Sequence, residues 1–261
     1  AGGGVAGLTA ALSLARAGAK VRLFEAQDVL GGRLSCGEQL SLDRRGVSMT
    51  FPLEHGVHGV WQRYGQLKKL LTSIGQSHRL CQAHEQGLIY RGHTGSARCL
   101  EIGEKVRSSL MPGALAPLAM LNSPAVLSEP LRFLKGGRGA GRRMLELIRF
   151  DPTTDLAALD HRSAADFVSG WSPLFVRMMR AMSHSGFFAE PEQVSQAALM
   201  MGLWFYGVSD KEDSRFHLLD ADAGTAVIEP LRRALMEAGA EVVAGTRLEA
   251  IETEEDRISG V

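Results

Sequence analysis

The sequence predicts an α/β fold, and three observations lead to this prediction. A glycine-rich turn at residues 2–7 is followed by a helical pattern and then by an alternating, strand-like pattern. A helix and a strand follow each other again at residues 225–243. Between these ends lie short apolar runs at residues 80–105 and helical patterns from residue 160 to residue 206. Helix and strand patterns that alternate along a chain are typical of α/β proteins.

The composition is that of an ordinary globular protein. Of the 261 residues, 45% are hydrophobic and 22% are charged, which argues against disorder. The 29 Lys and Arg residues balance the 29 Asp and Glu residues, so no overall charge attracts nucleic acid. Cys36, Cys81 and Cys99 are odd in number and lack the spacing of metal ligands. We therefore expect a reducing, cytoplasmic compartment and no nucleic-acid partner.

The glycine-rich turn carries the strongest functional signal. Gly2, Gly4 and Gly7 have the spacing G-x-G-x-x-G, which is typical of dinucleotide-binding loops. The first glycine permits a tight turn, the second lets a pyrophosphate approach the backbone, and the third allows a helix to pack closely on a strand. Val5 and Ala6 lie where that helix begins, and the dipole at a helix start favours phosphate charge.

The elements after the turn agree with this interpretation. Residues 8–17 are rich in Ala and Leu at helical spacing, and Gly18 is a good helix stop. Residues 19–25 alternate and predict a strand that ends at Glu25, where an acid can accept hydrogen bonds from ribose hydroxyls. A plain βαβ unit that binds nothing is the alternative. The order of turn, helix, strand and acid favours a dinucleotide site.

A second pair of glycines follows in Gly31-Gly32-Arg33. Two glycines let the backbone approach a cofactor, and a guanidinium offers paired donors to phosphate oxygens. The alternative is a flexible turn with a solvated arginine. The run GGGVAGLTAAL…VRLFEAQDVLGGR resembles the N-terminal signature of the glutathione-reductase-like FAD enzymes of the amine oxidase and phytoene desaturase superfamily. This resemblance implies FAD as the cofactor, bound by a Rossmann domain that carries an inserted α+β substrate domain.

The segment EHGVHGVW at residues 54–61 looks most like the carotenoid desaturase branch of this superfamily, which includes the β-carotene desaturases of aromatic carotenoid synthesis. In the superfamily the equivalent segment runs beside the flavin ring. His55 and His58 have no nearby third ligand and make a poor metal site, so we expect no metal. They either orient groups near the flavin or are loop histidines with ordinary hydrogen bonds.

The resemblance also divides the chain. Residues 1–75 and 221–261 are expected to form the FAD-binding domain, and residues 76–220 a substrate domain with a helical lid. Because the glycine turn has no strand before it and the last residues read as an interrupted strand, we expect a piece cut at both ends from a longer protein. Leu248 matches the superfamily position that meets adenine through its backbone. Together these interpretations give the cofactor-binding set Gly2, Gly4, Val5, Ala6, Gly7, Glu25, Ala26, Gly31, Gly32, Arg33, Glu54, His55, Gly56 and Leu248.

Other elements of the cofactor domain follow from periodicity. Residues 67–74 predict an amphipathic helix closed by Gly75. Residues 225–238 predict a helix with its leucines and Met236 pointing inward. Strands are expected at residues 239–243 and from residue 245 to residue 251.

Three helices are predicted in the substrate domain. Ser163 and Asp166 have the spacing of a capping box, and Ser172 followed by Pro173 is a typical helix start. A third helix is expected at residues 191–206. The methionines and aromatic residues of these helices are core residues by default. The alternative is that some of them line a tunnel for a hydrocarbon.

Apolar residues between 110 and 134 precede a basic run that contains Lys135, Arg138, Arg142 and Arg143. Apolar surface beside clustered cations is typical of a peripheral membrane contact. The alternative, which we favour, is a lid or loop whose apolar residues pack inward.

These interpretations predict an FAD-dependent oxidoreductase that desaturates a carotenoid or related isoprenoid, with hydride transfer to the flavin. Its partner is then a hydrophobic small-molecule substrate. No residue is identified as a catalytic base. The alternatives are an amine or protoporphyrinogen oxidase of the same superfamily, and a non-catalytic flavoprotein.

Overall fold

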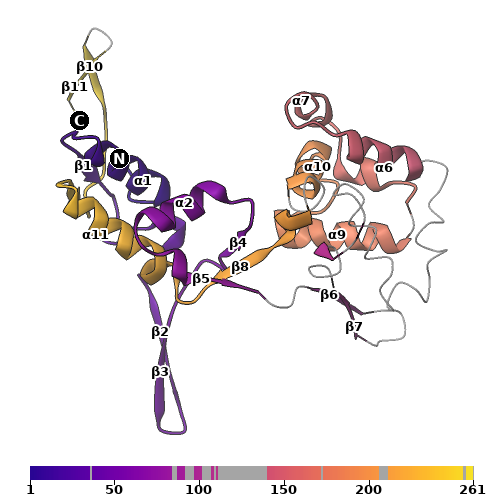
Figure 1. Ribbon diagram of the computed structural model, residues 1–261, viewed down its shortest axis with the longest axis horizontal. Coiled ribbons are helices and arrows are strands. Elements are labelled where there is room, and N and C mark those ends of the chain that lie inside the picture. Colours follow the sequence, from indigo (N-terminus) through magenta and orange to yellow (C-terminus); the bar gives the residue numbers. More distant parts are fainter. Residues whose placement is uncertain are drawn as a thin grey trace. The chain divides into compact units, whose positions relative to one another are not determined.

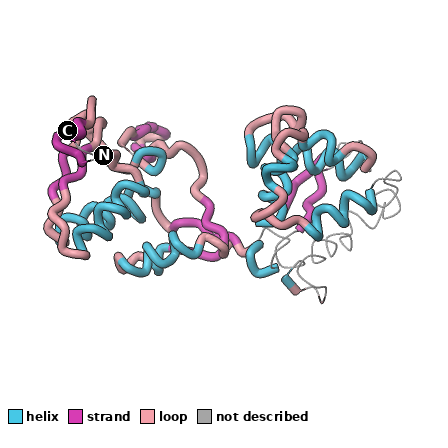
Figure 2. Tube along the Cα trace, turned by 90° about the horizontal axis from the view of Figure 1, so that it is seen from above, coloured by secondary structure: helices cyan, strands magenta, loops and turns pink. Residues whose placement is uncertain are grey.

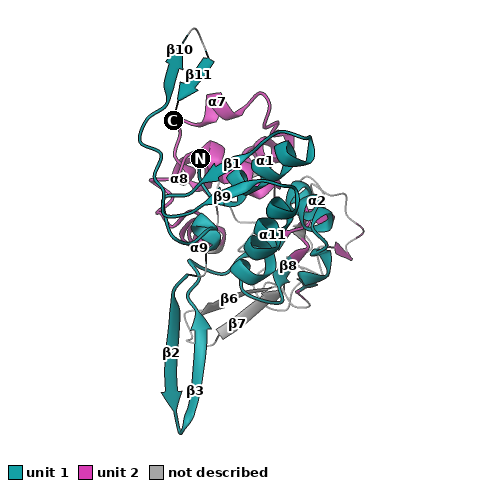
Figure 3. Cartoon of the chain, turned by 90° about the vertical axis from the view of Figure 1, so that its left-hand side faces the viewer, with its two compact units in different colours: residues 1–60, 64–82, 217–261 teal, residues 61–63, 83–216 magenta. Residues whose placement is uncertain are grey.

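The computed structural model describes two compact units, which Figure 3 shows in different colours. Unit 1 comprises residues 1–60, 64–82 and 217–261, and unit 2 comprises residues 61–63 and 83–216. Helices and strands occur in both units, which confirms the mixed α and β composition (Figure 2). The residues described are 1–35, 37–83, 87–91, 97–101, 107–108, 110, 140–171, 173–205, 211–254 and 257–260.

Unit 1 begins with the predicted helix and strand. Helix α1 (Val5–Arg16) buries an apolar stripe that contains Leu8 and Leu12, and Gly18 takes a φ of 86° in the turn that follows. Strand β1 (Arg22–Phe24), which lies near the N-terminus in Figure 1, pairs in parallel with β9 (Glu241–Val243). Two segments far apart in the sequence therefore lie side by side (Figure 3).

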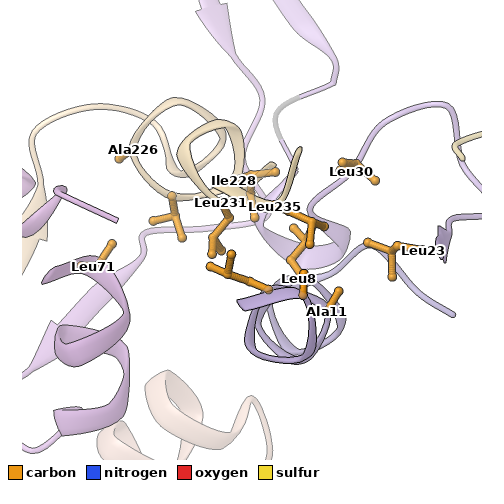
Figure 4. Packing of buried hydrophobic residues seen from close by; sticks show 12 residues of the cluster. Leu8, Ala11, Leu23, Leu30, Leu71, Ala226, Ile228, Leu231 and Leu235 are labelled. Carbon is orange, nitrogen blue, oxygen red and sulfur yellow. The ribbon is translucent and has the colours of Figure 1, made fainter. Parts of the chain in front are cut away.

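Helix α11 (Glu229–Glu237) closes the core of unit 1 against α1. Leu231 and Leu235 are fully buried and point toward Leu8 (Figure 4). The prediction that Met236 points inward was wrong, because its side chain is 52% exposed. Successive residues of an α-helix are turned by about 100° from one another, so Met236 cannot share the buried face of Leu235.

The remaining parts of unit 1 surround this core. The predicted helix at residues 67–74 is confirmed as α2 (Gly65–Ser73), with Leu71 buried and Gly75 at a φ of 72°. The strand expected at residues 245–251 is absent, since the next strand begins only at Glu252. The other elements are β2 (Gln39–Arg44), β3 (Val47–Pro52), β4 (Gly59–Trp61), η2 (Ser77–Arg79), β5 (Leu80–Gln82), β8 (Phe216–Leu219), β10 (Glu252–Glu254) and β11 (Arg257–Gly260).

Three small sheets connect these strands. The order β4-β8-β5 forms a three-stranded sheet, and β10 pairs antiparallel with β11. Strands β2 and β3 form an antiparallel hairpin, in which Leu40 lies opposite Phe51 and Leu42 opposite Met49. Residues opposite each other share a face of the ribbon, so one face of this hairpin is apolar.

The described residues of unit 2 form helices and one hairpin. The hairpin pairs β6 (Gly87–Arg91) with β7 (Ala97–Glu101), which confirms strands in the region predicted from residues 80–105. Phe167, Trp171 and Phe175 lie in its core, where the rings of Trp171 and Phe175 stack with centroids 3.9 Å apart. The helical segments are α6 (Ala140–Arg149), α7 (Leu156–Leu159), α8 (Ala164–Val168), α9 (Pro173–Phe187), α10 (Gln196–Leu203) and η5 (Lys211–Ser214).

Two of the predicted helix starts in unit 2 are confirmed. Ser163 Oγ accepts the Asp166 N–H, and the Asp166 carboxylate accepts the Ser163 N–H, which is the predicted capping box. Helix α9 begins at Pro173, whereas Ser172 lies outside the described residues. The third helix begins at residue 196 instead of 191, because Ser195 Oγ accepts the N–H of residue 198 and caps the helix there.

The basic run is described only in part. Lys135, Arg138 and the apolar residues from 111 to 134 lie outside the described residues. Arg142 and Arg143 lie on α6, and both pair with Glu146, at 3.4 Å and 3.0 Å. No helix within the described ranges is long and apolar enough to cross a membrane.

Candidate functional site

The glycine turn lies against the end of β1. Gly2, at a φ of 96°, donates its N–H to the Phe24 carbonyl at 2.8 Å. A Cβ atom on Gly7 would overlap the Gly2 carbonyl oxygen. Gly7 is therefore needed for close packing between the first turn of α1 and the start of the loop.

The carboxylate of Glu25 is held between two backbone donors. Its Oε2 accepts the Gly3 N–H at 2.6 Å, and its Oε1 accepts the Gln27 N–H at 2.9 Å. The hydrogen bond from Gln27, followed by that from Gly3, lowers the pKa of Glu25 below its ordinary value, and the positive charge of Arg247 adds to this effect. A carboxylate has about four acceptor positions, so Glu25 can accept further hydrogen bonds from a ligand.

The second glycine pair meets the first. Gly31 donates its N–H to the Gly3 carbonyl at 2.8 Å and forms a bridge with Gly4. Gly31 and Gly32 have φ values of 117° and 55°, a region that side chains disfavour. Arg33 is exposed and lies in the 3-10 turn η1 (Gly32–Leu34). The structure thus brings together two motifs that are separated in the sequence.

The start of α1 is open to an anion. Gly4 is the N-cap residue, and no side chain of the described residues accepts a capping hydrogen bond there. The first turn contains Val5, Ala6 and Gly7 and no acidic residue. A Cβ atom on Gly4 would have no neighbour within 4 Å, so the space next to the loop is free. The first backbone N–H groups of a helix lack partners within the helix, and they bind anions readily.

The segment that precedes Leu248, the predicted adenine contact, lies against the loop after β1. Thr246 donates its N–H to the Glu25 carbonyl at 2.8 Å, and Gly245 donates to the Gln27 carbonyl at 2.9 Å. These bonds explain why no strand forms here, because the segment pairs with the loop after β1. Leu248, which is half-buried, follows two residues later, while Ala26 is exposed beside Glu25. A cavity of about 550 Å³ opens between the loop after β1, the end of β9 and α11.

Glu54 is tied to the turn that precedes α11. Its Oε1 accepts the Ala223 N–H at 2.8 Å, directly before the π-helical turn η6 (Gly224–Ile228). At the other end of η6, Ile228 lies next to Gly31, since a Cβ atom on that glycine would be 3.1 Å from Ile228 Cγ1. Glu54 therefore contacts the segment that supports the second glycine pair.

The two histidines differ in their surroundings. His55 and the neighbouring Gly56 are exposed. His58 Nε2 is buried and lies 3.6 Å from Glu54 Oε1, an ion-pair distance that is too long for a hydrogen bond. Among the described residues Nε2 has no hydrogen-bond partner, so this nitrogen does not make the hydrogen bond expected of an ordinary loop histidine. No group of three His, Cys, Asp or Glu side chains that could hold a metal occurs in the described ranges.

Sequence reasoning missed three contributors to this arrangement. Gly3 bonds to both Glu25 and Gly31, and a Cβ atom on Gly3 would collide with Leu30. The unbroken run of three glycines was the available signal. Arg247 and the backbone of Ala223 left no signal, because they approach the site only through the fold.

Comparison with known proteins gives one family. The sequence model for flavin-containing amine oxidoreductases matches residues 5–260. The carotenoid phi-ring synthase of Chlorobaculum tepidum is 26% identical over 266 residues, which cover 100% of this chain and 38% of that protein. The 15-cis-phytoene desaturase of Arabidopsis thaliana is 26% identical over 265 residues, which cover 98% of this chain and 43% of that protein. The chain thus spans about two fifths of the length of these curated relatives.

Solved structures share the fold. An oxidoreductase from Methanosarcina mazei matches with a TM-score of 0.60 at 13% identity, covering 99% of this chain and 53% of its own. A triple mutant of putrescine oxidase matches with a TM-score of 0.60 at 16% identity, covering 97% of this chain and 51% of its own.

Proposed function

The chain belongs to the family of flavin-containing amine oxidoreductases, and from this membership we propose that it provides the FAD site and part of the substrate site of an enzyme that desaturates a carotenoid or a related isoprenoid. Unit 1 would bind FAD and unit 2 the hydrophobic substrate. The family match supports the cofactor, and two carotenoid-acting relatives that match nearly all of this chain support the substrate class.

One observation carries the cofactor part of this proposal, namely the contact between the two glycine motifs next to an uncapped helix start. The first turn of α1, with Val5, Ala6 and Gly7, would donate N–H groups to the pyrophosphate. Arg33 would add a positive charge beside the second glycine pair. The free space at Gly4 fits the approach of a phosphate, and the first turn of α1 contains no acidic residue that would repel it.

Other residues would hold the ends of the cofactor. Glu25, kept ionised by its two backbone donors, would accept hydrogen bonds from ribose hydroxyls. The backbone at Leu248 would meet the adenine, and the segment of Glu54, His55 and Gly56 would lie beside the flavin ring.

The oxidation itself would be the chemistry of the cofactor: bound flavin would accept a hydride from one allylic C–H bond, and the neighbouring carbon would release a proton to the medium as the new C=C bond forms. The protein would orient the polyene and exclude water. We name no base among the described residues. The sequence relatives favour a polyene, whereas the family description also covers amines.

The cofactor site is tested by a pair of glycine substitutions, Gly4→Ala and Gly65→Ala. Both glycines lie at a helix start, have no neighbour within 4 Å of an added Cβ, and have no positive φ. The new methyl group of Gly4→Ala would occupy the phosphate space, so we expect FAD affinity to fall by about tenfold or more, which corresponds to about 1.4 kcal/mol. FAD titration followed by flavin fluorescence measures the change. Equal affinities of the two variants would refute the assignment of the glycine loop.

The reaction is tested with the full-length protein in mild detergent, by recording its visible spectrum before and after anaerobic addition of a polyene. Bleaching of the flavin bands by a polyene would support desaturation. Bleaching by an amine or a porphyrinogen instead would reassign the substrate, and a flavin that stays oxidised with all three would indicate a non-catalytic flavoprotein. Protein without flavin would overturn the cofactor assignment.

A further inference from the structure

A charged cavity of about 450 Å³ lies within unit 2, between α6, α7 and α10. Its polar lining consists of Arg142, Arg149, Arg162, Glu146, Asp155 and Gln196. A polyene has no group that could use this lining. The cavity is therefore unsuited to the substrate proposed above, and its lining favours a charged ligand instead.

The charges of this cavity do not cancel. Glu146 is already engaged by Arg142 and Arg143. Asp155 accepts hydrogen bonds from the Asp151 N–H and the Thr154 hydroxyl, each at 3.0 Å. No acidic side chain in the described part of the chain pairs with the two remaining arginines. The cavity is therefore lined by two guanidinium groups that are available to an anion.

Arg149 and Arg162 suit a phosphate in particular. A guanidinium group is planar, stays charged at any physiological pH, and presents parallel N–H donors that match phosphate oxygens. Both side chains are exposed, so they can reach a ligand in the cavity. The backbone of Arg162 is joined to the start of α10, because its carbonyl accepts the Gln196 N–H at 2.7 Å.

The amide of Gln196 is a second, independent sign of a ligand. This residue has no exposed surface, and its Nε2 donates only to Met200 Sδ, at 3.4 Å. Its Oε1 has no hydrogen-bond partner among the described residues. A buried polar group without a partner costs about 1–3 kcal/mol, and most such groups are satisfied in native proteins. Because Gln196 lines the cavity, a turn of its side chain would bring this oxygen within reach of an O–H donor bound there.

We propose that the cavity of unit 2 binds a ligand that carries a hydroxyl group next to a phosphate group. Arg149 and Arg162 bind the phosphate oxygens, and the hydroxyl donates to Gln196 Oε1. Polyol phosphates have this chemistry, both as free metabolites and as the headgroup of a glycerol phospholipid.

The first test uses glycerol phosphate as the probe, with calorimetric titration of the full-length protein in a buffer free of phosphate. Binding should weaken by about tenfold or more in Arg149→Gln and in Arg162→Gln, because each loses a charged hydrogen bond. Arg180→Gln is the matched control, since it removes the same charge from an exposed residue of unit 2 outside the cavity. An equal loss in Arg180→Gln, or retained binding in the two cavity variants, would overturn the proposal.

The role of the hydroxyl is tested with Gln196→Met and a second probe, methyl phosphate, which has no hydroxyl group. Gln196→Met should weaken the binding of glycerol phosphate and leave that of methyl phosphate unchanged. If both probes lose affinity equally, the assigned contact at Oε1 is wrong.

The source of the phosphate is tested with vesicles of phosphatidylglycerol and of phosphatidylcholine. A lipid headgroup is identified if phosphatidylglycerol vesicles bind the protein and Arg149→Gln and Arg162→Gln release it, while glycerol phosphate does not bind. A free ligand is identified if glycerol phosphate binds and the vesicles do not. If neither binds, or if the vesicles bind all variants alike, the cavity is not a phosphate site.

Discussion

The glycine loop of unit 1 (residues 2–7) and the arginine cavity of unit 2 (around Arg149 and Arg162) differ in the groups that they offer to a ligand. The loop offers backbone N–H groups, the absence of a side chain at Gly7 permits its packing, and the space at Gly4 is free. The cavity offers the ends of long side chains and one buried amide. Contacts of the loop also join α1 to β1, so the proposed FAD site and the fold share the same atoms. The comparison predicts that Gly7→Ala in the loop should affect folding and binding together, whereas substitutions in the cavity should affect binding with little effect on folding.

The largest effect that this comparison predicts is that of Gly7→Ala. The added Cβ atom would overlap the Gly2 carbonyl oxygen, which is backbone and cannot swing away. We expect the free energy of unfolding to fall by about 3 kcal/mol, as for a severely overpacked site, together with loss of FAD binding. Urea unfolding measures the change, with Gly65→Ala as the control. Equal stability of the two variants would show that the packing at Gly7 does not contribute to the stability of unit 1. The proposed difference between the two sites would then be wrong.

A smaller, pH-dependent effect is expected for Glu25→Gln. The carboxylate accepts two backbone hydrogen bonds that favour its ionised form, so its folded-state pKa lies below the ordinary value of 4.5. Its stabilisation is therefore present above that value and is lost as the pH falls through the folded-state pKa. Near neutral pH the substitution should cost about 1.5–3 kcal/mol.

Urea unfolding at about pH 6 and at about pH 3 tests this pH dependence. The stability gap between the native protein and Glu25→Gln should narrow at the lower pH. A gap that stays constant would show that the charge of Glu25 contributes nothing.

The smallest effect, with the opposite sign, is expected for Gln196→Met in the absence of any ligand. The substitution keeps the side-chain volume and removes an unpartnered buried oxygen, so stability should stay equal or rise by about 1 kcal/mol. Thermal unfolding in phosphate-free buffer measures it. A marked destabilisation would mean that the Gln196 amide stabilises the fold of unit 2. Folding and binding would then be linked in both sites.

The glycine loop could be predicted from the sequence, whereas the cavity could not. Glycine spacing shows backbone conformation directly, so Gly2, Gly4, Gly7 and the second pair at Gly31 could be recognised before the fold was known. The cavity left no motif, because Arg149, Arg162 and Gln196 lie on separate helices and segments and meet only through tertiary packing.

Local structure was predictable to a similar extent. Periodicity located α1, α2 and α11, since each buries one apolar stripe. The start of α10 was missed because Ser195 is a better cap than the proline at 191, and a turn occupies the residues between them. The strand expected after residue 245 was missed because its backbone donors bond to the loop after β1, which no local pattern shows.

The parallel pairing of β1 with β9 has a consequence for the order of events during synthesis. Arg22 and Glu241, which are partners in this pair, are separated by 219 residues. At a synthesis rate of about 5–20 residues per second, roughly 10–40 s pass after β1 is made before β9 follows. During that interval the glycine loop lacks the segment of Thr246 that borders Glu25. Loading of the proposed FAD site would then be a late event, which follows translation of both segments.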